Sequence, residues 1–127
     1  MSTSARFSGS KNAENTARQY QNDFQTPAFA ATIALVIKRN AAKTIVKPAT
    51  LTGVVTFTAN VGDANNPPYV GDEIDFFLTP DGTTRVVTFG TGFLPTATLS
   101  VTTAKQAFIS FEFNGTAWIE TARAVNA

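Results

Sequence analysis

The chain has 127 residues, of which 43% are hydrophobic and 15% charged, and it contains neither cysteine nor histidine. Its length and apolar content are those of one globular domain. The absence of cysteine and histidine excludes disulfides, zinc sites built from these residues, and Ser-His-Asp or cysteine catalysis. No apolar run reaches the roughly 18 residues of a membrane span, so we expect no membrane partner.

The charges are unevenly distributed along the chain. Residues 1–47 hold seven basic and two acidic side chains, a net charge of +5, whereas residues 48–127 hold three basic and seven acidic ones, a net charge of −4. Together they give the overall +1. Halves of opposite sign are typical of a protein that docks one end on an acidic surface or on copies of itself.

The first part of the chain, residues 1–27, is rich in Ser, Asn, Gln, Ala and Thr. Such a composition is too poor in apolar residues to fold alone, although a short helix over residues 12–20 is compatible with it. We therefore expect an extended N-terminal arm held by neighbouring molecules. Its spaced aromatic residues Phe7, Tyr20 and Phe24 are the predicted anchors.

The rest of the chain, residues 28–127, alternates between apolar and polar residues over short segments. This alternation predicts strands rather than helices. The expected strands are 29–37, 44–46, 51–61, 73–78, 85–89, 98–102, 107–113 and 118–121, with a loop over 62–68. Asp81-Gly82 and Asn114-Gly115 are typical of tight hairpin turns, and Asn114-Gly115 matches the type with two positive φ angles. The sequence thus predicts an all-β fold, a single antiparallel β-sandwich or jelly-roll-like domain.

Two phenylalanines do not fit the alternation. Phe77 and Phe108 lie on the strand faces opposite the main apolar rows. A sheet with one face in water does not favour rings there, so we predict that they form an oligomer contact.

The segment from Arg85 to Arg123 carries a recognisable pattern. It resembles a small β-domain of tailed-phage virion proteins, of the capsid-decoration, head-fibre and tail-fibre C-terminal type, over about residues 51–125. The matching residues are Val87, Thr88, Phe89, Gly90, Gly92, Phe93, Thr98, Leu99, Phe111, Gly115, Thr116, Trp118, Glu120 and Arg123. Asn114 stands where the family more often has Asp. The resemblance implies membership of a virion, and it implies a homotrimer, because such domains are often trimeric.

Several residues have the chemistry of a site. Lys38, Arg39, Lys43 and Lys47 form a basic cluster without interleaved aromatic residues, which favours an acidic protein surface over nucleic acid. The acidic residues Asp72, Glu73 and Asp75 have the oxygen ligands that calcium prefers, but they lack the spacing of an EF-hand, and solvated carboxylates at a strand end are the better explanation. We predict no catalytic residue, no metal site and no cofactor.

These observations predict a non-enzymatic structural protein of a phage virion. It would decorate or cement the capsid as a head-fibre or decoration subunit, with the major capsid protein or another virion protein as partner. The alternative is a tail-fibre or tail-tip component that binds a host surface glycan. A glycan hydrolase that uses carboxylates is a third, much weaker hypothesis.

Overall fold

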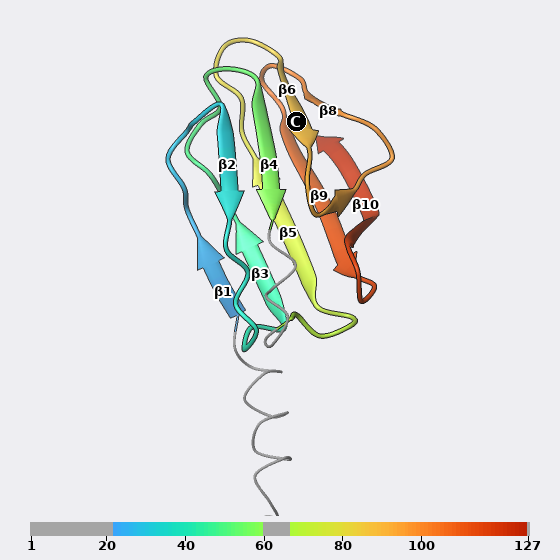
Figure 1. Ribbon diagram of the computed structural model, residues 1–127. Coiled ribbons are helices and arrows are strands. Elements are labelled where there is room, and N and C mark those ends of the chain that lie inside the picture. The colour runs from blue at the N-terminus through green and yellow to red at the C-terminus, as the bar shows by residue number, and fades with distance from the viewer. Residues whose placement is uncertain (1–21, 60–66, 127) are drawn as a thin grey trace, which may run out of the picture.

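The computed structural model describes residues 22–59 and 67–126, and all regular secondary structure in this part is β (Figure 1). The all-β expectation is therefore confirmed. The helix expected over residues 12–20 lies outside the described residues. The strands are β1 (Asn22–Gln25), β2 (Thr32–Leu35), β3 (Lys43–Val46), β4 (Val55–Ala59), β5 (Glu73–Leu78), β6 (Arg85–Phe89), β7 (Phe93–Leu94), β8 (Leu99–Val101), β9 (Gln106–Phe113) and β10 (Trp118–Asn126).

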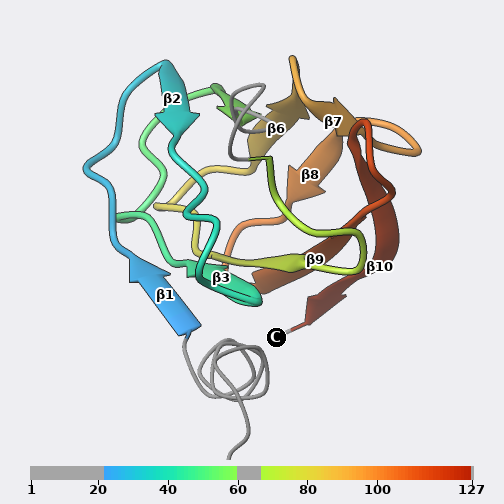
Figure 2. The same ribbon diagram turned by 60° about the horizontal axis from the view of Figure 1, so that its bottom comes forward.

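The strands form two sheets that face one another with the core between them (Figure 2). The larger sheet has the order β1-β3-β5-β9-β10-β7, and the smaller has the order β2-β4-β6-β8. From β1 to β6, each strand lies in the sheet opposite the one before it. The first six strands therefore wind as three successive coils: β1–β2, β3–β4 and β5–β6.

Each of the three coils has a proline at the same corner, where the chain leaves the larger sheet. In each coil a proline stands two residues after the strand of the larger sheet: Pro27 after β1, Pro48 after β3 and Pro80 after β5. Proline cannot donate a ladder hydrogen bond, so it ends the strand and starts the turn toward the other sheet. Backbone bonds join these corners: Ala49 N–H donates to the Pro27 carbonyl at 2.9 Å.

This winding fixes the strand directions. Successive strands lie in opposite sheets, so the strands that pair come from successive coils and run parallel: β1 with β3, β3 with β5, β2 with β4, and β4 with β6. The sandwich is thus mixed rather than wholly antiparallel, and the antiparallel pairs are β5–β9, β9–β10 and β6–β8. The Asp81-Gly82 turn accordingly joins two sheets, and the hairpin expected there was wrong.

The β9–β10 hairpin closes through residues 114–117. Gly115 has a positive φ of 103°, whereas Asn114 does not, so the turn with two positive φ angles was a wrong expectation. Asn114 instead uses its side chain: its Oδ1 accepts hydrogen bonds from the backbone N–H groups of Thr116 and Ala117, both at 2.8 Å. This local side-chain bonding is typical of Asn at turns.

The core is built from aromatic rings that the two sheets contribute. Phe57 and Phe89 come from the smaller sheet, and Phe76 and Phe111 from the larger one. The Phe57–Phe76 and Phe89–Phe111 ring centroids are both 4.9 Å apart, in tilted geometry. Tilted contacts of this kind stabilise beyond the burial of apolar area. The motif residue Trp118 is fully buried against Phe113.

In the first coil, the side chains of β1 that point toward the edge of the core are polar. The residues of β1 that stand opposite the buried Thr44 and Val46 of β3 are Asp23 and Gln25. An inward carboxylate on an edge strand opposes pairing with a further strand.

β1 also lies within the arm expected over residues 1–27, so the last part of that arm belongs to the β-domain. In the described ranges, no helix has the length and hydropathy that crossing a bilayer requires.

Candidate docking surface

The outer face of the six-stranded sheet carries several of the side chains that sequence analysis singled out. Strand register arranges them in rows across the sheet. One row contains Lys43, Glu73 and Glu112, and the next contains Phe24, Ile45, Asp75 and Ser110. A third row places Phe77 directly opposite Phe108. Side chains alternate between the two faces of a strand, so these residues point outward while their neighbours in each strand point into the core.

Phe77 and Phe108 stack against each other on this outer face. Their ring centroids are 5.3 Å apart with the planes inclined by 55°, and Phe77 keeps 44% of its surface exposed. Phe24, on edge strand β1, is 62% exposed. Aromatic residues that stay partly exposed on a sheet face are suited to contact with another molecule.

A polar network of Lys43, Glu73, Asp75 and Ser110 lies on the same face of the sheet. Lys43 Nζ is 3.2 Å from Asp75 Oδ2 and 3.9 Å from Glu73 Oε2. The Ser110 hydroxyl donates to Asp75 Oδ1 at 2.7 Å. Asp75 is only 4% exposed, so its charge has left water and needs these partners.

The network sets the protonation of its members. Hydrogen bonding with Asp75 raises the pKa of Lys43 above its usual value. Burial on its own raises the pKa of Asp75, but hydrogen bonds with Glu73, Ser110 and Lys43 outweigh it and hold the pKa below the usual range. Hydrogen bonding with Asp75 also raises the pKa of Glu73. The Ser110 hydroxyl is within hydrogen-bond distance of both carboxylates, 2.7 Å from Asp75 Oδ1 and 3.3 Å from Glu73 Oε2, so it is held inside this ion-pair network.

The four basic residues of the predicted cluster do not form one free patch. Lys38 Nζ lies 3.3 Å from Asp23 Oδ1, and Lys43 is held in the network described above. The Arg39 guanidinium lies over the Tyr69 ring, with Cζ 4.2 Å from the centroid, and donates to Tyr69 Oη at 2.7 Å. Lys47 is exposed where β3 ends. The other two predicted anchors, Phe7 and Tyr20, lie outside the described residues.

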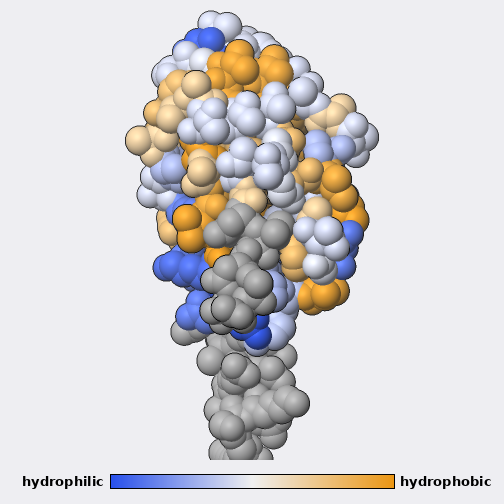
Figure 3. Space-filling model, viewed as in Figure 1, coloured by the Kyte–Doolittle hydropathy of each residue, from blue (hydrophilic) through white to orange (hydrophobic). Residues whose placement is uncertain are grey.

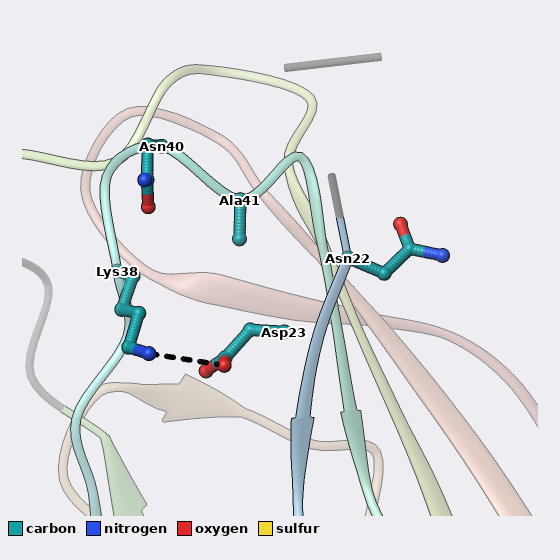
Figure 4. A pocket seen from close by; sticks show the side chains of 5 residues that line it. All are labelled: Asn22, Asp23, Lys38, Asn40 and Ala41. Atoms are coloured by element: carbon teal, nitrogen blue, oxygen red, sulfur yellow. Dashed lines mark ion pairs between the residues drawn. The ribbon is translucent and has the colours of Figure 1, made fainter. Parts of the chain in front are cut away.

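A small polar pocket opens beside the Asp23–Lys38 ion pair (Figure 4). It has a volume of about 200 Å³ and is lined by Asn22, Asp23, Lys38, Asn40 and Ala41. The side chains come from the start of β1 and from the connection between β2 and β3. Its Asp23 and Lys38 neutralise each other, so the pocket presents amide groups and no net charge.

The acidic residues near the start of β5 are bound to the protein itself. Asp72 Oδ2 accepts a hydrogen bond from the Tyr69 backbone N–H at 3.0 Å, while Glu73 and Asp75 face Lys43. Among the residues that the structure describes, no group of three acidic side chains is placed to hold a metal ion.

Sequence reasoning missed the partners within this surface. Ser110 and Tyr69 had not been singled out, yet Ser110 holds Asp75 and Tyr69 holds Arg39. Their roles depend on the pairing of β5 with β9 and on the fold of residues 67–72, which local pattern does not determine. The Glu120–Arg123 contact was readable from the motif and is present, with Arg123 Nε 2.6 Å from Glu120 Oε2.

On the side shown in Figure 3, hydrophobic side chains lie at separate places, at the top and along the right of the view, and hydrophilic ones gather at the lower left. Neither a comparison with protein-family models nor one with curated proteins found a match.

Proposed function

We propose that this chain is a non-enzymatic structural protein of a tailed-phage particle, where it decorates or cements the capsid. The observation that carries the proposal is the outer face of the six-stranded sheet. Phe24, Phe77 and Phe108 face outward there, on the same sheet that the N-terminal segment enters at Asn22. The resemblance of residues 51–125 to virion β-domains supplies the kind of particle.

The chemistry of this face supports docking rather than catalysis. Its most buried polar residue, Asp75, is held by Lys43 and Ser110. The exposed apolar groups on this face are small and separate, so each would contribute little binding energy alone. Many weak contacts on a symmetric lattice add up by avidity, which suits a subunit that is present in many copies.

We further propose that the particle-bound form is a homotrimer with Phe77 and Phe108 at the subunit contact. The two rings contact each other in tilted geometry, and Phe77 stays 44% exposed. A second copy that covers them would remove aromatic area from water, at about 25 cal/mol for each Å² buried. Multi-angle light scattering of the full chain tests the trimer, and a monomer at every concentration, with no trimer on particles, would contradict it.

Attachment is tested by sedimenting labelled full-length chain with purified particles that lack it. The first variant is the double substitution Phe7→Ser and Tyr20→Ser, and the second is a deletion of residues 1–21, which stops before β1 begins at Asn22. We expect both to lose attachment mainly through faster dissociation, because buried aromatic anchors slow it. Full attachment of both variants would refute the anchoring role of the segment.

The basic contribution is tested by a matched pair of charge reversals. Lys47→Glu reverses the exposed lysine at the end of β3, and Lys105→Glu reverses an exposed lysine between β8 and β9. If Lys47 meets an acidic partner, Lys47→Glu slows association and the effect fades with added salt, while Lys105→Glu has little effect. Equal effects of the two variants would show that only net charge matters.

Copy number separates capsid from tail. Quantitative mass spectrometry of particles should give a copy number comparable with that of the major capsid protein. A handful of copies would instead place the chain on the tail, as the glycan-binding alternative requires.

A further inference from the structure

A second, larger pocket opens on the outer face of the six-stranded sheet, near the β9–β10 hairpin. It has a volume of about 380 Å³ and is lined by Val70, Glu112, Phe113, Asn114, Ile119 and Thr121. Val70 is held over this end of the sheet because the backbone N–H of its neighbour Gly71 donates to the Phe113 carbonyl at 2.8 Å. The pocket is therefore part of the folded sheet rather than a gap between loose loops.

The pocket combines apolar walls with one carboxylate. Val70 is 73% exposed and Ile119 is 38% exposed. Glu112 lies opposite Ile119 in the β9–β10 register and is exposed. Lysine and arginine side chains have complementary halves, an apolar stem and a charged head, so this pocket matches the side chain of a basic residue.

The neighbouring charges favour a cation at the same place. Glu112 stands directly opposite Glu73 in the antiparallel β5–β9 pair, and like charges opposite one another destabilise a sheet. Lys43 contacts Glu73 and Asp75 but makes no ion pair with Glu112 in the described residues. An added ammonium or guanidinium group would relieve the repulsion between the two glutamates.

The sequence contains a segment with the required charge. Residues 1–21 carry Arg6, Lys11 and Arg18 against a single acid, Glu14. They join the described chain at Asn22, whose row across the sheet runs through Lys43 to Glu73 and Glu112. The segment is therefore long enough, and starts near enough, to reach this face of its own or of an adjacent molecule.

We propose that the pocket between Val70 and Ile119 binds a basic side chain from the N-terminal segment, residues 1–21, of a second copy of the chain. A segment of the same copy would have to cross Lys43 and Glu73, which lie between Asn22 and Glu112 in this row. A second copy reaches the pocket from its open side. The inference rests on the proposed function, which it deepens by naming where an arm would attach to a neighbouring subunit.

Zero-length crosslinking with a carbodiimide tests the contact, since it joins a carboxylate only to an amine that touches it. The full-length chain is prepared with Arg6→Lys and Arg18→Lys, so that each basic position of the segment carries an amine and keeps its charge. Equal amounts of unlabelled and ¹⁵N-labelled chain are mixed before coupling. We expect crosslinks from the segment to Glu112 with mixed isotopes, which identify two different copies.

Two other results would overturn the proposal: crosslinks to Glu112 within one copy only, or segment crosslinks that never include Glu112. Glu120 is the internal control, because Arg123 already occupies it at 2.6 Å. The experiment contains no phage particle. A failure of the chain to attach to particles would therefore refute the proposed function without affecting this result.

A substitution provides the second measurement. Glu112→Gln removes the carboxylate, and Ser100→Lys, at the exposed residue of β8 in the other sheet, makes the same change in net charge. In sedimentation velocity over a concentration series we expect Glu112→Gln to weaken self-association by about two- to five-fold, the range for an exposed ion pair. Equal weakening by both variants would overturn the pocket's role.

Discussion

Phe76 and Phe77 are adjacent in β5 and face opposite sides of the six-stranded sheet. Phe76 is completely buried and contacts the rings of Phe57, Phe89, Phe93 and Phe111. Phe77 is 44% exposed and contacts Phe108. The same side chain therefore holds the two sheets together at one position and faces outward at the next.

We expect alanine at these two positions to separate folding from association. Phe76→Ala should lower the free energy of unfolding by about 3–5 kcal/mol, because it leaves a cavity where both sheets meet. Phe77→Ala should lower it by less than about 1 kcal/mol, as surface substitutions do, and should reduce trimer formation. Denaturant unfolding and light scattering measure the two effects, and a similar loss of stability in both variants would contradict this division.

Gly92 is required by the backbone around it. Its φ is 94°, and a Cβ atom there would collide with the carbonyl oxygen of Ala59. We expect Gly92→Ala to destabilise the protein by at least ~2 kcal/mol, through a strained backbone and a clash that no side chain can relieve. Gly82→Ala is the control, because nothing lies within 4 Å of the added atom. An equal change in melting temperature for both would show that the clash is relieved elsewhere.

Local alternation predicted eight of the ten strands in the described residues, and it failed for the way they pair. The apolar residues Ile74, Phe76 and Leu78 point inward as expected. The residues of a strand do not reveal which other strand pairs with it. The parallel pairing between strands of successive coils was therefore missed. The signal that could have shown it is the proline two residues after three successive strands, at Pro27, Pro48 and Pro80. Such a spacing marks a repeated corner.

The docking surface was predictable to a similar extent. The outward direction of Phe77 and Phe108 follows from period-two alternation, but their contact depends on the β5–β9 register. The basic cluster was seen as a set of free charges, because its partners Asp23, Asp75 and Tyr69 are distant in sequence or in another strand. Strand β7 was missed because two residues cannot show a period, and β1 was missed because it lies in the polar segment that was expected to be an arm.

The Lys43 network gives a prediction with opposite signs for its two carboxylates. The pKa of Glu73 is raised, so its ionised form is disfavoured on folding, and the stability that it contributes below its unfolded pKa is lost as pH rises through the folded value. Glu73→Gln should therefore raise the unfolding free energy at pH 7 by a few tenths of a kcal/mol, roughly the size of a cross-strand pair. The gain should disappear in acid, where Glu73 is protonated.

Asp75→Asn is the matched variant for that experiment. The pKa of Asp75 is lowered, and its carboxylate binds both Lys43 and Ser110. Its removal should destabilise the protein at pH 7. Unfolding by denaturant at neutral and acidic pH measures both variants. A loss of stability in Glu73→Gln at pH 7 would contradict the prediction that folding disfavours the ionised form of Glu73.

The Glu120–Arg123 pair predicts part of the acid sensitivity of the fold. Arg123 lies 2.6 Å from Glu120 Oε2, Thr96 N–H donates to Glu120 Oε1 at 2.8 Å, and Arg123 donates to the Thr98 carbonyl at 3.0 Å. These contacts fasten β10 to the segment before β8. Hydrogen bonding with Arg123 is the main reason why the pKa of Glu120 lies below its usual value.

A lowered folded pKa means that the stabilisation is fully present above the unfolded pKa, about 4.3 for glutamate, and is lost as pH falls through the folded value. We expect Glu120→Gln to lower the unfolding free energy at pH 7 by about 1.5 kcal/mol, the lower end of the range for hydrogen bonds to a charged group. The difference from the unmodified chain should shrink below about pH 4. A constant difference between Glu120→Gln and the unmodified chain at every pH would show that shape, and not the charge of Glu120, fastens β10 to the neighbouring segment.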